Sequence, residues 1–275
     1  MNGAAVNWSR ILAPLAGIDR DEVVLEAAAR LAEPFEAEVA GVFAPAELAD
    51  LTPWMGEGFM GGVQMAAVES LKEAAVNGRK ASRASVHALA YEPKLFKTLE
   101  SPVWMALALE CRLSDVVVFD NEAARGRGPL AQAFQQILAV EQRPVVIARA
   151  GLDPAGHVVL AWDGGKEATR AVRTAFPLLQ KAKTVTILGV QTSAQGEFDP
   201  AALQDFLAKR GVVADAHLVK GSGEAAPLLL KTAREIGASL FVAGAYGHPR
   251  LREFIFGGAT RTFLHADAPS LFLSH

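Results

Sequence analysis

The feature that most constrains this chain is an internal repeat. Two prolines and one apolar run in its first half each recur 125 positions later. The matching pairs are Pro102 with Pro227, Pro144 with Pro269, and residues 116–118 with residues 241–243. Self-similarity at a fixed spacing is typical of a duplicated structural unit, and it is stronger evidence for a fold than any single motif.

The first copy is longer than the second. Gly17 and Gly164 lie 147 positions apart, so the first copy carries about 22 extra residues, which we place around 45–77. A turn-rich linker at 150–156 separates the copies. The sequence therefore predicts two domains, residues 1–150 and 151–275.

Short apolar runs alternate with segments of helical spacing throughout both copies. Strands are predicted at 10–15, 39–44, 85–90, 115–119 and 144–148, and again at 157–162, 184–190, 212–219, 240–243 and 271–273. Helices are predicted between them, among them 167–179, 200–209 and 227–236. This alternation predicts an α/β fold with parallel strands and helices on both faces of the sheet.

Composition limits the classes of function. The chain has 275 residues with 51% hydrophobic content, which suffices for two cores, and its net charge of −3 gives no reason to expect nucleic acid or an anionic membrane as partner. Cys111 is the single cysteine, which favours a reducing compartment. No secretory signal and no run of about 20 apolar residues is visible. We expect a soluble, cytoplasmic protein.

Small residues cluster near the end of the second copy, where a strand ends and a later helix begins. They are Gly244, Gly247, Gly257, Gly258, Ala259 and Thr260. At such places the backbone can come close to a phosphate, and the N–H groups of a helix start favour anions. The alternative interpretation is that these glycines only shape turns and cap the helix.

The spacing Gly244-x2-Gly247-x9-Gly257 resembles the nucleotide signature of the universal stress proteins, G-x2-G-x9-G followed by Ser or Thr. The sequence departs from that pattern at Gly258, where the hydroxyl residue is missing, whereas Thr260 matches a second hydroxyl position. Because the resemblance covers both copies, the chain looks like a tandem universal stress protein.

That resemblance implies a particular fold. Each domain is expected to be a doubly wound parallel sheet of the adenine nucleotide alpha hydrolase-like type, with strand order 3-2-1-4-5. The final strands, at 145–148 and 271–273, are expected to meet in an intramolecular pseudo-dimer. Association of two chains into a homodimer is also compatible with the family.

The resemblance further implies ATP or AMP as ligand in the second domain, with Mg²⁺ accompanying ATP. Asp163, which follows Ala161 and Trp162, falls beside the adenosine, and the backbone of Val190 falls beside the adenine. Asp163 can equally be a helix N-cap. The missing hydroxyl at Gly258 removes one hydrogen bond, worth about 1 kcal/mol, and is expected to weaken binding more than abolish it.

The first domain is expected to lack such a site. Phe119, Glu122, Gln132 and Gln135 stand where the second domain has Gly244, Gly247, Gly257 and Thr260, and Ala16 stands for Asp163. A phenylalanine would obstruct a phosphate and a glutamate would repel it. We therefore expect a degenerate structural domain, in which the glycine-rich stretch 54–62 forms a flap or a partner surface.

Other signals are weaker. The pattern Gly221-x-Gly223-x-x-Ala226 has the form of a dinucleotide fingerprint but follows a third strand, and residues 163–166 form only part of a phosphate loop. Cys111 is expected in the core. His248, Arg250 and Arg252 are expected on a solvated loop, and the alternative is that they contact a phosphate or screen its charge. The histidines have no metal-ligand spacing, so no metal site is predicted.

No nucleophile, base and acid form a set, so no catalytic residue is predicted. The favoured hypothesis is a stress-response sensor or regulator that binds an adenine nucleotide and hydrolyses it slowly or not at all. The alternative is a protein of the same fold that binds no nucleotide and acts through protein partners. A third hypothesis is a nucleotide-using enzyme of the same fold group.

Overall fold

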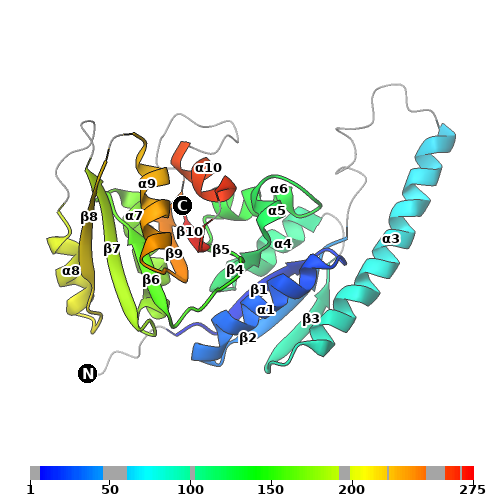
Figure 1. Cartoon of the computed structure of the whole chain (residues 1–275). Helices are drawn as coiled ribbons and strands as arrows, with labels where there is room; N and C mark the ends of the chain where they lie inside the picture. Colours follow the sequence, from blue (N-terminus) through cyan, green and yellow to red (C-terminus); the bar gives the residue numbers. More distant parts are fainter. Residues whose placement is uncertain are drawn as a thin grey trace.

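The strands of both copies lie in one ten-stranded sheet (Figure 1). It belongs to a computed structural model, which describes residues 7–45, 61–99, 103–191, 199–221, 223–245, 258–266 and 268–275. The first half of the chain contains β1 (Arg10–Leu15), α1 (Arg20–Ala32), the short 3₁₀ helix η1 (Glu33–Phe35), β2 (Glu38–Phe43), α3 (Gly61–Ala88), β3 (Lys94–Thr98), α4 (Val103–Arg112), β4 (Val116–Phe119), α5 (Asn121–Ala124), α6 (Ala131–Gln135), the π-helical turn η3 (Gln136–Val140) and β5 (Val145–Ile147). The second half contains β6 (His157–Ala161), α7 (Lys166–Leu179), β7 (Thr184–Gln191), α8 (Ala201–Ala208), β8 (Asp215–Lys220), α9 (Ala225–Glu235), β9 (Leu240–Gly244), α10 (Gly258–His265) and β10 (Ser270–Ser274).

The sheet reads β3-β2-β1-β4-β5-β10-β9-β6-β7-β8, so each half has the predicted order 3-2-1-4-5. Pairs within a half are parallel, whereas β5 and β10 pair antiparallel at the centre. In that pair Val146 lies opposite Phe272, and the predicted contact between the two final strands is confirmed. Because this pairing is antiparallel, the carboxyl ends of the strands in the two halves point in opposite directions.

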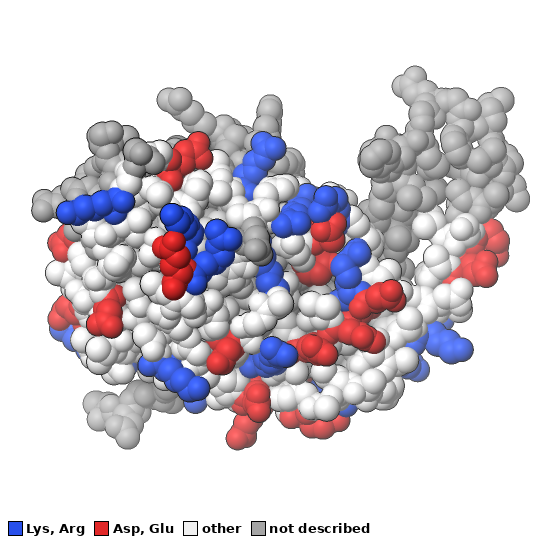
Figure 2. All heavy atoms as spheres, in the orientation of Figure 1, with Lys and Arg blue, Asp and Glu red and all other residues white. Residues whose placement is uncertain are grey.

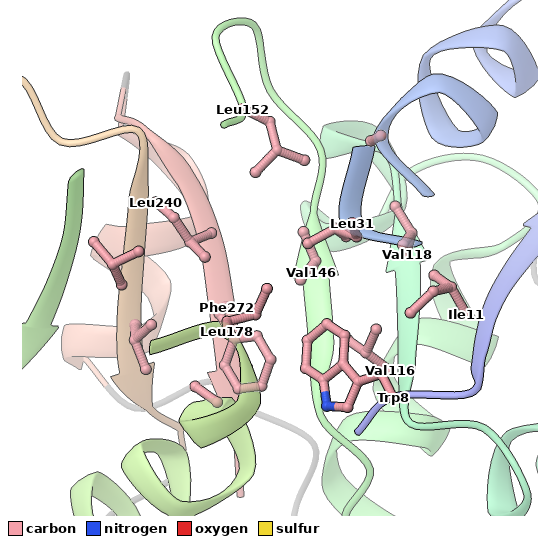
Figure 3. Packing of buried hydrophobic residues seen from close by; sticks show 14 of the residues in the cluster. Trp8, Ile11, Leu31, Val116, Val118, Val146, Leu152, Leu178, Leu240 and Phe272 are labelled. Carbon is pink, nitrogen blue, oxygen red and sulfur yellow. The ribbon is translucent and has the colours of Figure 1, made fainter. Parts of the chain in front are cut away.

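Helices cover both faces of the sheet, as expected for parallel strands buried on both sides. One face carries apolar residues of α1, α7 and α8, and the other carries those of α4, α6, α9 and α10. On the first face the core is continuous across the central strands. Trp8, just before β1, stacks on Phe272 of β10 with ring centroids 6.2 Å apart, and it also meets Phe35 at 5.1 Å (Figure 3).

The predicted strand at 85–90 is wrong. Residues up to Ala88 continue α3, and the third strand is β3, further along. Residues 85–90 alternate in a way that is also typical of a strand. Ser82 and Val86, however, are both buried and lie four residues apart, so they share one face of a helix. β3 lies at the edge of the sheet, where Leu95 is 39% exposed, so its apolar pattern is weak.

The extra length of the first copy is found largely in α3, which has 28 residues against 8 in its counterpart α8. The amino-terminal part of α3 reaches beyond the body of the molecule (Figure 1). Most of the glycine-rich stretch 54–62 lies outside the described residues, and its last two residues begin α3.

Charge and apolar length give two further observations. On the face shown in Figure 2, acidic and basic side chains are interspersed, in keeping with the net charge of −3. Among the helices that the structure describes, none combines the length and the apolar character that crossing a bilayer requires.

The continuous core yields a stability prediction. Trp8 is 4% exposed and contacts both halves, so Trp8→Ala is expected to lower the free energy of unfolding by about 3–5 kcal/mol. Val213→Ala, at a residue that is 85% exposed, is the control and should change it by less than about 0.5 kcal/mol. Urea titrations of both variants test this, and equal effects would contradict the bridging role of Trp8.

Candidate functional site

The second half has a topological switch point between β6 and β9. The chain leaves β6 toward β7 on one side, while β9 lies on the other side of β6. In open parallel sheets, ligands bind outside the carboxyl ends of the strands at such a point. Several of the residues predicted as a site lie at or just beyond the ends of β6, β7 and β9, and the sheet brings these strand ends to the same edge.

At the end of β6, backbone and side chains are held by local hydrogen bonds. Ala161 is the last residue of the strand, and the N–H of Trp162 donates to the carbonyl of Leu188 at 2.8 Å. The exposed carboxylate of Asp163 accepts the N–H of Gly165 at 2.8 Å. α7 has Gly165 as its N-cap, so the alternative interpretation of Asp163 as the N-cap is wrong, and Asp163 instead stabilises the turn before the helix.

Val190 presents its backbone at the predicted edge. It is the second residue beyond Leu188, whose neighbour on β6 is Ala161, the last residue of that strand. N–H and C=O groups alternate sides along a strand, so those of Val190 point to the same side as those of Leu188, beyond the end of β6. The Val190 side chain is buried, which leaves the backbone as the part able to meet a ligand.

Gly244 ends β9 and has a packing role. A Cβ at this position would lie 2.6 Å from the carbonyl carbon of Glu167 and 2.7 Å from the nitrogen of Ala168. The first turn of α7 therefore approaches the end of β9 more closely than any side chain allows. This contact explains the glycine without a ligand, and it also fixes the amino-terminal end of α7 at the switch point.

The start of α10 contains three predicted residues in two different environments. Gly258 and Ala259 are exposed, and a Cβ added to Gly258 would meet nothing within 4 Å. Thr260 is 3% exposed and lies on the face of α10 turned toward the protein. Gly247 and Gly257 lie outside the described residues, as do His248, Arg250 and Arg252.

The sequence interpretation missed one polar group at this edge. His275 follows β10, and its Nδ1 lies 3.1 Å from the carbonyl oxygen of Ala245, the residue after Gly244. A hydrogen bond there requires Nδ1 to carry the proton. The available signal was positional: β10 is the parallel neighbour of β9, so a residue after β10 reaches the edge where β9 ends.

The corresponding edge of the first half is filled. Phe119 occupies the position of Gly244, is fully buried and meets Phe134 edge-on at 5.4 Å. Asp120 caps α5 through the N–H of Ala123 at 2.7 Å and pairs with Arg20 at 2.5 Å. The cavity beside them holds about 10 Å³, roughly room for one water molecule.

An internal carboxylate also occupies this edge. Asp21 accepts the N–H groups of Ala16 and Gly17, both at 2.9 Å, and the hydroxyl of Ser82 at 2.7 Å. α3 crosses the same loop, because a Cβ on Gly17 would lie 2.2 Å from the Cα of Gly78. Gly17 and its counterpart Gly164 share the left-handed conformation, with φ of 77° and 76°.

The weaker sequence signals have structural explanations. Gly221 and Gly223 follow β8, the outermost strand, which is distant from the switch point in the strand order. Cys111 is fully buried, and burial is the main reason that its pKa rises to about 11, so it is a poor nucleophile. In the part of the chain that the structure describes, no group of three or more His, Cys, Asp or Glu is arranged to hold a metal ion.

The two described glycines of the site give opposite predictions for substitution by alanine. Gly244→Ala forces a Cβ into the backbone of α7 and is expected to destabilise the protein by about 1–3 kcal/mol. Gly258→Ala has open space at the start of α10 and is expected to be neutral or to stabilise by up to about 1 kcal/mol. Chemical denaturation distinguishes them, and a harmless Gly244→Ala would contradict the close approach of α7.

Comparison with known proteins agrees with this topology. No protein-family model matches the sequence, and no curated protein matches it either. A solved structure of a universal stress protein from Archaeoglobus fulgidus DSM 4304 superposes with a TM-score of 0.65 at 15% identity, covering 98% of this chain and 96% of that one. A protein from Pseudomonas aeruginosa PAO1 described as functionally unknown has a TM-score of 0.56 at 14% identity, covering 97% and 92% of the two chains.

A third solved structure, from Pseudomonas aeruginosa UCBPP-PA14 and described as a candidate universal stress protein, has a TM-score of 0.56 at 14% identity and covers 97% of this chain and 93% of that one. The similarity extends over both halves in all three comparisons. The chain therefore has the fold of the universal stress proteins in its tandem, two-copy form.

Proposed function

We propose that this chain is a tandem universal stress protein, with domains 1–150 and 151–275, that binds ATP or another adenine nucleotide at the carboxyl edge of its second half. One observation carries the proposal. The two halves share a fold and a strand order, yet this edge is filled by side chains in the first half, whereas the second half has Gly244 at the position of Phe119. Asp21, Phe119 and α3 fill the first edge.

The start of α10 is suited to phosphate. The first N–H groups of a helix have no partners within it, and the positive end of the helix dipole favours anions. Gly258 and Ala259 are exposed there, and the space around Gly258 leaves room for phosphate oxygens to approach the backbone. Phe263 packs on Phe241 of β9 with ring centroids 5.2 Å apart, which fixes the helix against the sheet.

The adenosine would lie toward β6 and β7. The backbone groups of Val190 beyond the end of β6 offer a donor and an acceptor to a base. Asp163 is exposed, and while one of its oxygens holds the turn the carboxylate retains acceptor capacity for a ribose hydroxyl. Mg²⁺ would bind with ATP through the phosphates, as it usually does with few protein ligands.

A regulatory role fits these residues better than catalysis. The described residues of this edge include Asp163 and His275, but His275 bonds to the backbone of Ala245 and Asp163 to that of Gly165. We infer a sensor that changes its partner contacts when nucleotide binds, in the cytoplasm, with slow or absent hydrolysis.

The second candidate is a protein of the same fold that acts through partners without nucleotide. Two observations favour it. Gly258 supplies no hydroxyl to a phosphate, and the close packing of Gly244 on Glu167 accounts for that glycine without any ligand. The two candidates are separated by titration with nucleotide.

Substitutions of Gly258 test the site without disturbing the fold. Gly258→Glu places a negative charge at the start of α10, which suits the helix dipole but repels phosphate, so ATP should bind about 10–100-fold more weakly while stability is kept. Gly258→Ser restores a hydroxyl and should tighten binding by about fivefold to tenfold. Calorimetry with ATP measures both, with Gly258→Ala as the matched control.

The outcomes separate the candidates. If the parent protein gives no heat and no thermal shift at millimolar ATP, the nucleotide proposal fails and the partner hypothesis takes its place. If the parent binds but Gly258→Glu binds equally well, the phosphates lie elsewhere than at the start of α10.

A further inference from the structure

We propose that the first half positions α10, the helix on which the proposed phosphate site depends, through two arginines that hold its carboxyl-terminal end. This inference deepens the proposed function, and it rests on that function only where it concerns nucleotide affinity. The two arginines, Arg125 and Arg149, are called the arginine clamp below.

Arg149 makes most of the contacts. Its Nη2 donates to the carbonyl oxygens of Phe263 at 2.9 Å and Leu264 at 3.2 Å, and its Nη1 donates to that of Pro269 at 3.2 Å. Its backbone N–H donates to the hydroxyl of Ser270 at 3.1 Å. The second residue after β5 therefore binds the end of α10 and the connection to β10.

Arg125 reinforces the same end. Its Nε donates to the carbonyl of Leu264 and its Nη2 to that of His265, both at 3.2 Å. The last carbonyls of a helix have no partners within it, and cations there are favourable. The clamp thus satisfies groups of the second half with side chains of the first.

Hydrogen bonds dominate at this junction. The clamp residues border a hollow of about 340 Å³ whose other walls are Asn121 and four alanines, Ala148, Ala150, Ala266 and Ala268. Among the described residues that line the hollow, none has a large apolar side chain, so packing there offers little to offset the truncation of an arginine. The arginines therefore hold this end of α10 together with the apolar packing of Phe263 and Leu264, which are buried against the sheet.

The clamp is connected to the filled edge of the first half. Asn121, the first residue of α5, accepts from Nε of Arg149 at 3.3 Å, and Arg125 follows α5 directly. The same short helix is capped by Asp120, which pairs with Arg20. Groups at the first edge and the helix of the second edge therefore belong to one network, which spans the junction between halves.

The arginine clamp acts on the proposed site by fixing the position of α10, and not through its charge. α10 has eight residues and is about 12 Å long. Over that distance the direct attraction between the guanidinium groups and a phosphate at the far end of the helix is weak compared with that of a contact pair. A shift of the rigid helix, by contrast, moves Gly258 and Ala259 directly.

Arg149 has no equivalent arginine in the second half. At the spacing of the repeat, Ser274 corresponds to Arg149, so the second half offers no arginine there to the first. Arg250 corresponds to Arg125 and lies outside the described residues. The first half therefore supports α10, the helix of the proposed site, and receives no equivalent support from position 274 of the second half.

The test uses the full-length chain with Arg149→Met and Arg149→Lys. Arg149→Met removes hydrogen bonds to three carbonyls, so amides of residues 258–266 should exchange hydrogen about tenfold faster or more, with the amides of β6 unchanged. Arg149→Lys keeps the charge without the planar fork, and should resemble Arg149→Met. Nucleotide affinity should fall by about tenfold in both.

The matched control is Arg127→Met, in the same part of the first half, whose guanidinium pairs with Glu122 at 2.6 Å. It should leave the exchange of residues 258–266 as in the parent protein. If Arg149→Met does not fold, Arg125→Met removes the weaker part of the clamp and should change the same amides in the same direction.

Each outcome either supports or overturns a part of the proposal. Unchanged exchange in Arg149→Met, or an Arg149→Lys variant equal to the parent, overturns the clamp. Faster exchange with unaltered ATP affinity overturns the link between the clamp and the site. A parent protein that binds no ATP overturns the proposed function, while the exchange data still decide whether the first half positions α10.

Discussion

The antiparallel pairing of β5 with β10 is the interaction on which the rest of the structure depends. Every residue in its register is fully buried, including Val146 and Phe272. Without this pairing, each half would end its sheet in an unprotected apolar edge strand, which promotes aggregation. Joining the two edges removes both liabilities and creates the continuous core in which Trp8 contacts Phe272.

The same pairing determines where the two carboxyl edges lie. Equivalent strands run in opposite directions in the two halves, so α10 starts at the edge of the second half and returns toward the edge of the first. Its carboxyl end therefore meets Arg125 and Arg149, which follow α5 and β5 of the first half. Figure 1 shows α10 reaching toward α5 and α6. The proximity of the clamp to α10 is a consequence of sheet geometry.

The sequence predicts the central part of the fold well, because its strands are buried on both faces. Residues 116–119 and 240–244 are continuous apolar runs that recur with the repeat, and both are strands. β3 could not be found this way, since Lys94 and Lys97 interrupt the pattern of an edge strand. Residues 85–90 were predicted as a strand, but the packing of Val86 against Gly41 places most of them in a helix.

The candidate site could be predicted less completely than the fold. Spacing identified Gly244 but could not reveal its contact with Glu167, because a glycine needed for packing and one needed for a ligand look alike in a sequence. The clamp was not predictable either. Arg149 and Phe263 are 114 residues apart, and no periodicity records a hydrogen bond between a long side chain and a distant carbonyl.

Fusion of the two copies in one chain explains how their edges could diverge. In a symmetric homodimer, any substitution appears at both equivalent positions, so an arginine that holds one helix would also hold the other. Here Asp21 fills a loop whose counterpart has Ala168, and Arg149 has Ser274 as its counterpart. In a single chain, one copy can thus support a helix of the other copy, which carries the proposed nucleotide site.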